Sequence, residues 1–207
     1  MDALILVDIQ NDFLPGGALA VPKGDEIIPV VNRIQERFEL VVATQDWHPV
    51  GHSSFASSHP GTKVFDTVVV DGIKQILWPD HCIQGSRGAE FSQAFSTNRV
   101  EAIVRKGTNL EIDSYSTFYD NARRKSTGLE GYLKWKGVDR VFLAGLAADF
   151  CVYYSTIDAL SLGFQAVVIK DGTRAISEEG FRAAEKHILA KGGTIVRSES
   201  LFGSVTP

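Results

Sequence analysis

A cysteine at the start of an expected helix is the most reactive candidate in this sequence. Cys151 follows an apolar run, residues 141–144, and a short turn rich in glycine and alanine, and it precedes an amphipathic run, residues 152–162, that Gly163 ends. This pattern predicts strand, tight turn and helix, with Cys151 in the first helical turn. Unpaired backbone N–H groups and the helix dipole favour an anion there, so we expect an easily ionised thiol. Cys151 is therefore a candidate nucleophile, although a small buried core residue fits the same local pattern.

Three further polar residues stand at or just past the ends of other apolar runs. They are Asp8, Asp46 and Lys106. Because ligands bind at the carboxyl ends of the strands in open α/β sheets, we expect these side chains and Cys151 to converge on one rim. The Asp8 carboxylate could take the thiol proton, and the Lys106 ammonium could stabilise both anions, which predicts a Cys-Asp-Lys triad. Backbone N–H groups of the turn before Cys151, together with its own, could stabilise an oxyanion.

The pair Asp46 and His48 indicates a metal site. Residues two apart in extended backbone point to the same side, so both side chains could reach one ion. A carboxylate with imidazoles suits zinc, iron or manganese, and an open catalytic site needs about three protein ligands. We choose His81 as the third ligand, with His52 and His59 as the competitors.

The chain alternates between short apolar runs and segments with apolar residues at helical spacing, which predicts a parallel sheet with helices on both faces. The expected strands are residues 3–7, 40–44, 102–104, 141–144, 166–169 and 194–196. The expected helices are residues 25–38, 129–136, 152–162 and 177–191, the last with Phe181, Ala184, Ile188 and Leu189 facing inward. Residues 51–93 should be mostly irregular, and a loop region of this length is usually functional.

Composition indicates an ordinary soluble globular protein. The chain has 207 residues, 44% of them hydrophobic and 22% charged, and we expect one domain over residues 1–207. The net charge of -4 comes from mixed charges without a basic block, which argues against nucleic acid or an anionic membrane as a partner. No apolar run approaches a membrane span, and a strand that begins at Ala3 leaves no room for a signal peptide. Two cysteines form no disulfide framework, and a free thiol suits a reducing cytoplasm.

Six motifs follow one another from near the first strand to the Cys151 turn. They are residues 8–13 (DIQNDF), 46–49 (DWHP), 78–82 (WPDHC), 106–107 (KG), 113–116 (DSYS) and 145–151 (GLAADFC). In combination they resemble the nicotinamidases of the isochorismatase-like cysteine hydrolase superfamily. The resemblance implies a three-layer α/β sandwich with a six-stranded, mainly parallel sheet. It also implies hydrolysis of nicotinamide to nicotinate and ammonia through a cysteine thioester, in NAD salvage, with pyrazinamide as a further substrate.

The resemblance assigns roles to individual positions. It implies a catalytic triad of Asp8, Lys106 and Cys151. It implies one divalent metal ion per chain, zinc before iron or manganese, whose open position takes the pyridine nitrogen and whose ligands are Asp46, His48 and His81. It implies a cis peptide bond between Leu146 and Ala147, with oxyanion donors from the backbone of Ala147 and Cys151. Substrate contacts are implied for Phe13, Trp78, Leu146 and Ala147.

Other interpretations stay open at this stage. Ala148 stands where many relatives carry threonine, and Phe150 where tyrosine or histidine is common, which bears on substrate preference. Another amide or carbamoyl hydrolase of the superfamily would share the triad, but a carbamoyl substrate has no ring nitrogen for the metal. An isochorismatase proper would need no catalytic cysteine. A catalytically silent nucleotide- or metal-binding domain could use the same sheet, although no G-x-G-x-x-G follows the first strand. The oligomeric state is open, with a homo-oligomer among the options.

Overall fold

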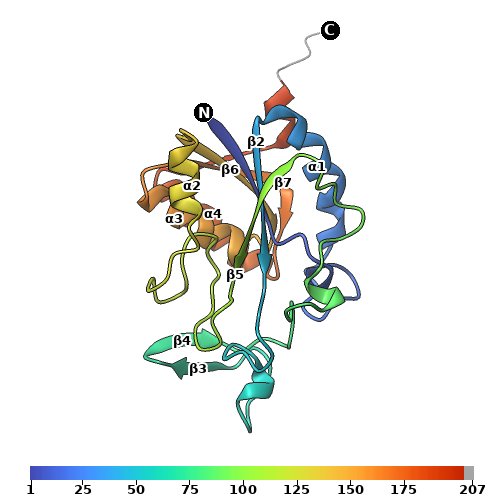
Figure 1. Cartoon of the computed structure of the whole chain (residues 1–207), viewed down its shortest axis with the longest axis vertical. Coiled ribbons are helices and arrows are strands. Elements are labelled where there is room, and N and C mark those ends of the chain that lie inside the picture. The colour runs from blue at the N-terminus through green and yellow to red at the C-terminus, as the bar shows by residue number, and fades with distance from the viewer. Residues whose placement is uncertain (203–207) are drawn as a thin grey trace.

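A six-stranded parallel sheet forms the centre of the computed structural model, which describes residues 1–202 (Figure 1). The strand order is β5-β2-β1-β6-β7-β8, and every pair of neighbours is parallel. The strands are β1 (Asp2–Val7), β2 (Leu40–Asp46), β5 (Val100–Lys106), β6 (Arg140–Leu146), β7 (Gln165–Arg174) and β8 (Thr194–Val196). The predicted six-stranded α/β architecture is therefore confirmed. Residues 203–207 of the predicted domain lie outside the described residues.

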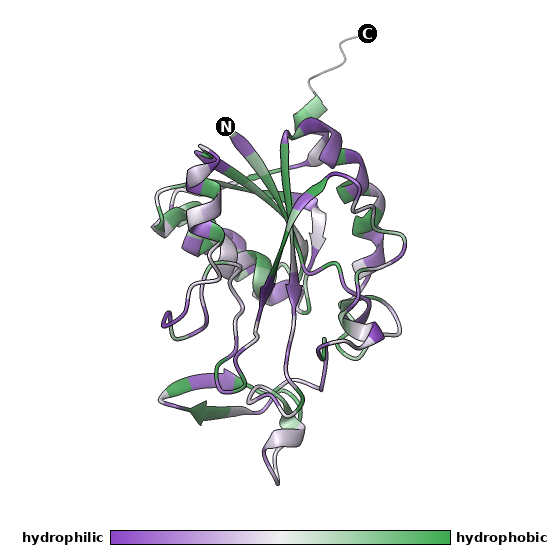
Figure 2. Ribbon diagram, in the orientation of Figure 1, coloured by the Kyte–Doolittle hydropathy of each residue, from purple (hydrophilic) through white to green (hydrophobic). Residues whose placement is uncertain are grey.

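Helices cover both faces of the sheet and create two hydrophobic cores. The helices are α1 (Ile28–Ile34), α2 (Leu129–Trp135), α3 (Cys151–Ser161) and α4 (Glu178–Ala190). In β1, Leu4 and Leu6 pack in the core that contains α1, whereas Ala3, Ile5 and Val7 pack in the core that contains the other three helices. All five side chains are 0% exposed. A strand covered on both faces appears in the sequence as an unbroken apolar run, which is why β1 could be predicted. Figure 2 shows the strands mostly in hydrophobic green between helices with hydrophilic stretches.

Two helix predictions need correction. The expected helix over residues 25–38 consists of a 3-10 turn (Gly24–Ile27), α1 and a second 3-10 turn (Gln35–Arg37). Pro29 lies in the first turn of α1, where its missing N–H costs no hydrogen bond, so the α-helix begins just before it. Leu189 was predicted to face inward but is 57% exposed, because it lies about 100° around α4 from the buried Ile188.

The long irregular segment contains a hairpin that the sequence analysis missed. β3 (Thr67–Val70) and β4 (Ile73–Ile76) pair antiparallel and form a separate two-stranded sheet. Asp71 and Gly72 connect them with φ values of 50° and 81°, the backbone that a tight Asp-Gly hairpin turn requires. Figure 1 shows the hairpin beyond the carboxyl ends of β2 and β5, at the opposite end of the molecule from the N-terminus.

None of the helices within residues 1–202 combines the length and the apolar character needed to cross a bilayer.

Candidate active site

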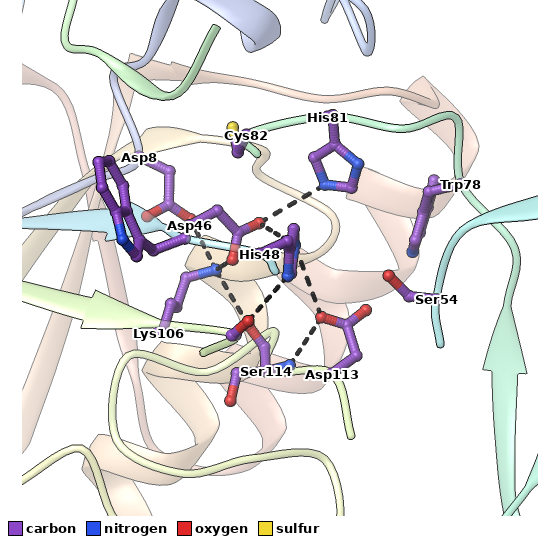
Figure 3. A network of polar contacts seen from close by, with 12 residues as sticks. Asp8, Asp46, His48, Ser54, Trp78, His81, Cys82, Lys106, Asp113 and Ser114 are labelled. Atoms are coloured by element: carbon purple, nitrogen blue, oxygen red, sulfur yellow. Dashed lines mark hydrogen bonds and ion pairs between the residues drawn. The ribbon is translucent and has the colours of Figure 1, made fainter. Parts of the chain in front are cut away.

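The carboxyl ends of four strands bring the predicted polar residues together. Asp8 directly follows β1, Asp46 ends β2, Lys106 ends β5, and Cys151 begins the helix that follows β6. Asp46 and Lys106 are register partners across β2 and β5. Figure 3 shows the side chains of Asp8, Asp46 and Lys106 pointing toward one another. The predicted convergence of these side chains is present in the structure.

Gly145 allows the strand that leads to Cys151 to pass close to β1. Its φ is 122°, and a Cβ atom there would lie 2.0 Å from the carbonyl oxygen of Val7. Only glycine accepts both the backbone angle and this close approach. The glycine therefore keeps the turn before Cys151 beside the end of β1, where Asp8 begins the next loop.

The Lys106 ammonium lies at the centre of the site. Its Nζ donates hydrogen bonds to Asp46 Oδ1 at 2.8 Å, to the Ser114 carbonyl at 3.0 Å and to Cys151 Sγ at 3.5 Å. Asp8 Oδ2 lies 2.8 Å from the same Nζ as an ion pair. Lys106 is 1% exposed, and although burial alone would lower its pKa, Asp46 and Asp8 raise it well above the usual value.

The two oxygens of Asp8 have different partners. Oδ1 accepts the Thr44 hydroxyl at 2.6 Å, whereas Oδ2 is buried and faces the Lys106 ammonium at 2.8 Å. Burial raises the pKa of Asp8, with the Lys106 charge acting in the opposite direction. A carboxylate oxygen of Asp8 lies within 4.8 Å of Cys151 Sγ. This arrangement suits a carboxylate that takes a proton from the thiol, since catalytic hydrogen bonds are often long before substrate binds.

The thiol itself behaves differently from the sequence prediction. Burial raises the pKa of Cys151 well above its usual value, and the neighbouring carboxylates add to this while Lys106 opposes it. This direction is opposite to the easily ionised thiol expected at a helix N-terminus. Because the thiol keeps its proton near neutral pH, it needs a base to become a nucleophile.

Asp46, His48 and His81 form a cluster that can hold a metal ion. Their candidate ligand atoms lie within 4.8 Å of one another. The Nδ1 of His48 faces the Gly107 carbonyl at 3.0 Å, and the Nδ1 of His81 faces the Pro79 carbonyl at 2.8 Å. A carbonyl only accepts, so both imidazoles carry hydrogen on Nδ1, and in their neutral form they have a lone pair on Nε2. These Nε2 atoms lie 3.4 and 3.7 Å from Asp46 Oδ2 (Figure 3).

The electrostatics agree with a ligand role for Asp46. Burial alone would raise its pKa, but Lys106 and His48 lower it well below the usual value. The Nε2 of His48 is buried and has no hydrogen-bond partner within residues 1–202. A permanently anionic carboxylate and two imidazole lone pairs with backbone-fixed orientation are the donor set of an open zinc-type site.

The two competing histidines fit a ligand role less well. His52 lies against His48 with ring centroids 4.2 Å apart, and His48, His52 and Asp113 form a second cluster of potential ligands. However, the Ser54 N–H donates to His52 Nδ1 at 3.2 Å, so the lone pair is on Nδ1 and the Nε2 carries hydrogen. Burial, with His48 nearby, lowers the pKa of His52 to about 4. His59 Nε2 bonds the Ser53 carbonyl at 2.7 Å instead.

The turn before Cys151 offers two backbone donors. The peptide bond between Leu146 and Ala147 is cis, as the resemblance implies. The N–H groups of Ala147 and Cys151 donate to no backbone carbonyl in the described part of the chain. Cys151 is the first residue of α3, where an unpaired N–H is expected. Asp149 anchors the turn by accepting the N–H groups of Ile176 and Ser177 at 3.0 and 2.9 Å.

A mostly apolar cavity opens beside the thiol. Cys151 lines it together with Asp46 and His81. Phe13 and Trp78, which the resemblance implies as substrate contacts, also line it. Aromatic walls with a few convergent polar groups suit a small planar ligand.

Known proteins with this arrangement identify the family. The family described as Isochorismatase domain matches residues 2–200. The chain belongs to the isochorismatase family. It is 46% identical over 201 residues to a nicotinamidase from Acinetobacter baylyi, covering 97% of this chain and 94% of the relative.

Two solved structures extend the comparison of this isochorismatase-family chain. A nicotinamidase and pyrazinamidase from Acinetobacter baumanii has a TM-score of 0.95 and 44% identity, covering 97% of both chains. A pyrazinamidase from Pyrococcus horikoshii in complex with zinc has a TM-score of 0.79 and 36% identity, covering 95% of this chain and 98% of the other. In this chain, the cluster of Asp46, His48 and His81 indicates a divalent metal ion.

The structure places some lining residues of this isochorismatase-family cavity differently from the sequence analysis. Leu146, assigned to substrate contact, is 0% exposed and packs in the core, where its Cδ1 approaches Gly24. Cavity residues that were given no role are Leu19, Asp113, Tyr115, Phe150 and Ile176. Asp113 and Tyr115 lie in the quoted DSYS motif, and Phe150 was noted as a departure, so these three had a sequence signal. Leu19 and Ile176 had none.

Proposed function

We propose that this protein hydrolyses nicotinamide to nicotinate and ammonia, in NAD salvage. One observation carries the proposal: Lys106 joins the Asp8 and Cys151 pair to a metal-ligand set through Asp46, beside a cavity lined by aromatic rings. The resemblance to a nicotinamidase from Acinetobacter baylyi supports the substrate class. Pyrazinamide is proposed as a second substrate because it is a ring amide of the same size.

Recognition would rest on the aromatic cavity and the metal ligands. Phe13 and Trp78 would hold a flat heteroaromatic ring, since planar rings bind well against aromatic side chains. When bound to Asp46, His48 and His81, a divalent ion would supply a Lewis-acidic position for the ring nitrogen. We propose zinc, with iron or manganese as the alternatives, because carboxylate with imidazole accepts all three.

The first half-reaction would form a thioester. Asp8 takes the proton of the Cys151 thiol, and the thiolate attacks the carboxamide carbon. The backbone N–H groups of Ala147 and Cys151 stabilise the oxyanion of the tetrahedral intermediate. Asp8 then gives its proton to the amide nitrogen, the C–N bond breaks and ammonia leaves. Lys106 keeps its charge throughout and compensates the anion on whichever of Asp8 and Cys151 carries it.

The second half-reaction would release the acid. Asp8 deprotonates a water molecule, which attacks the thioester carbonyl in the same oxyanion hole. The C–S bond breaks, nicotinate leaves, and the proton on Asp8 returns to the Cys151 sulfur. Asp8 thus accepts a proton twice and donates it twice in each catalytic cycle. Burial raises its pKa, which makes proton uptake easier and agrees with this role.

The remaining expectations are part of the proposal. Residues 1–207 would form a single isochorismatase-like hydrolase domain, and a nucleophilic thiol would suit the reducing cytoplasm. Nicotinamide would be the partner molecule, without nucleic acid or membrane, and a homo-oligomer stays an option.

The test is product formation by the purified metal-loaded protein. Nicotinamide should yield nicotinate and ammonia in equal amounts. Benzamide, which has the same shape but no ring nitrogen, should react with a much lower kcat/KM. Hydrolysis of an N-carbamoyl substrate in preference to nicotinamide would instead assign the protein to the carbamoyl hydrolases of the same superfamily.

A further inference from the structure

Gln75 is a buried polar residue on an otherwise accessible hairpin. Gln75 is 4% exposed, whereas every other residue of β3 and β4 is exposed or half-buried. Glutamine is mostly found at protein surfaces, and buried polar groups are nearly always hydrogen-bonded. We therefore expect the buried Gln75 amide to have a hydrogen-bond partner in the body of the protein.

The Gln75 amide faces three oxygen atoms. Its Nε2 lies 2.8 Å from the Ile76 carbonyl, 3.1 Å from Asp113 Oδ2 and 3.2 Å from the Tyr115 hydroxyl. Three surrounding acceptors identify this end of the side chain as the NH2 group, which donates only. Asp113 and Tyr115 both line the cavity beside Cys151. Gln75 therefore joins the hairpin to the cavity wall.

The Tyr115 hydroxyl oxygen also contacts Trp78. Trp78 Nε1 donates to it at 3.1 Å, and an indole N–H can only donate. The Gln75 NH2 group has two hydrogens for its three acceptors, so the Tyr115 oxygen accepts from Trp78 and shares the Gln75 donors with the other two oxygens. Trp78 is 4% exposed, and its ring meets Phe150 edge-on with centroids 4.9 Å apart. Its indole N–H therefore has a hydrogen-bond partner in Tyr115, while Phe150 packs against its ring.

We infer that Gln75 is a positioning residue for the substrate cavity, which acts through Tyr115 to fix the ring of Trp78. The inference rests on the proposed function, because it takes Trp78 as a wall of the nicotinamide site. A second tie between hairpin and body, the ion pair of Asp71 and Arg124, has side chains 56% and 55% exposed. Exposed ion pairs hold a structure weakly, so the buried amide is the effective link.

The kinetic test replaces Gln75 by methionine, which keeps the length of the side chain but has no donor. We expect KM for nicotinamide to rise about 10-fold, the effect of losing one well-placed buried hydrogen bond, with kcat changed less than about 3-fold. Lys74→Met, on the exposed face of the same strand, and Arg124→Gln, which removes the ion pair, should keep both constants. An unchanged KM in Gln75→Met, or an equal loss from Lys74→Met, would overturn the inference.

A spectroscopic test works without turnover and does not depend on one variant. The fluorescence of Trp78 is obtained as the difference between each protein and its Trp78→Phe counterpart. Gln75→Met and Tyr115→Phe should both shift this signal, and adding Gln75→Met to Tyr115→Phe should change it little further, because both act on the same oxygen. Additive shifts, or none, would contradict the relay. A wild-type protein inactive on nicotinamide would refute the proposed function while leaving this arm to decide the positioning role.

Discussion

Two carboxylates contact the same ammonium and acquire opposite properties. In the proposed mechanism, Asp8 and Cys151 form the nucleophile half of the site, and Asp46, His48 and His81 form the metal half. Lys106 Nζ lies 2.8 Å from a carboxylate oxygen in each half. Yet burial raises the pKa of Asp8, whereas Lys106 and the imidazoles lower the pKa of Asp46 in spite of its burial.

The difference comes from the other neighbours of each carboxylate. Lys106 and Thr44 lower the pKa of Asp8, but burial and the anion of Asp46 raise it. Asp46 has two imidazoles in addition to Lys106. These opposite pKa directions suit the proposed roles, in which Asp8 exchanges a proton and Asp46 stays an anion that would bind a cation. Pairs of groups whose surroundings separate their pKa values mark distinct roles in a site.

The largest expected effect removes the nucleophile and leaves the metal half intact. Cys151→Ala should lower kcat by more than about 1,000-fold, about 4 kcal/mol of transition-state stabilisation, because no thioester can form. Metal content by elemental analysis should stay at the wild-type value. Cys82→Ala is the matched control, since Cys82 is also a buried free cysteine but does not line the cavity. A Cys151→Ala enzyme that retained more activity would rule out the covalent route.

The next largest effect removes the metal half. Substituting alanine for Asp46, His48 or His81 should lower metal affinity by more than about 100-fold, because each would supply one of about three ligands. Loss of a residue that only supports a ligand typically lowers metal affinity about 10–100-fold. Metal content after dialysis measures this. His59→Ala provides the control, since its ring bonds the Ser53 carbonyl instead. Unchanged metal in any of the three ligand variants would refute that residue's assignment.

A smaller effect separates the orientation of a ligand from its presence. Gly107 has φ 64°, and a Cβ there would lie 2.5 Å from His48 Cε1. Gly107→Ala should displace the His48 ring and lower metal affinity about 10-fold, as loss of outer-shell support does. Gly61→Ala, also at positive φ but with open space around it, controls for backbone strain. Equal metal affinity in both variants would show that the close approach of Gly107 does not orient His48.

The smallest effect adjusts the proton affinity of Asp8. Because the pKa of Asp8 is raised, Asp8 takes up its proton at a pH above the 3.8 of an ordinary aspartate. The protonated form cannot act as the base, so kcat/KM should fall as pH drops through this range. Thr44→Val removes the hydroxyl that stabilises the anion, so the pKa of Asp8 should rise further and the acid limb should move about one unit to higher pH. The pH profile of kcat/KM measures this. A shift to lower pH would contradict the role of Asp8 as the base.

The sheet and the strand-end residues could be predicted because they depend on local patterns. Buried strands appear as apolar runs, and a parallel topology collects their carboxyl ends, so Asp8, Asp46 and Lys106 could be placed without coordinates. The positions of residues in the loops cannot be predicted from such a pattern. The residues alone left His81 in competition with His52 and His59, and the choice between them depends on which backbone carbonyl or N–H each ring meets.

Other features depend on contacts that no local pattern encodes. An easily ionised Cys151 was predicted from its helix position, but burial, which depends on the whole fold, has the largest effect and raises its pKa. Gln75 on β4 reaches Asp113 and Tyr115 in a distant loop, across 38 and 40 positions of sequence. Leu189 fitted the apolar spacing of its helix and is nevertheless exposed, because α4 covers the sheet with a narrower face than its sequence suggests.

The separation of roles around Lys106 is tested most directly by measuring metal content and single-turnover ammonia release from nicotinamide in Asp8→Asn and Asp46→Asn side by side. Asp8→Asn should keep its metal and release almost no ammonia, whereas Asp46→Asn should lose its metal. An Asp8→Asn protein that lost its metal as Asp46→Asn does, or that released ammonia at the wild-type rate, would contradict the division of the site into a proton-exchanging carboxylate and a metal-binding one.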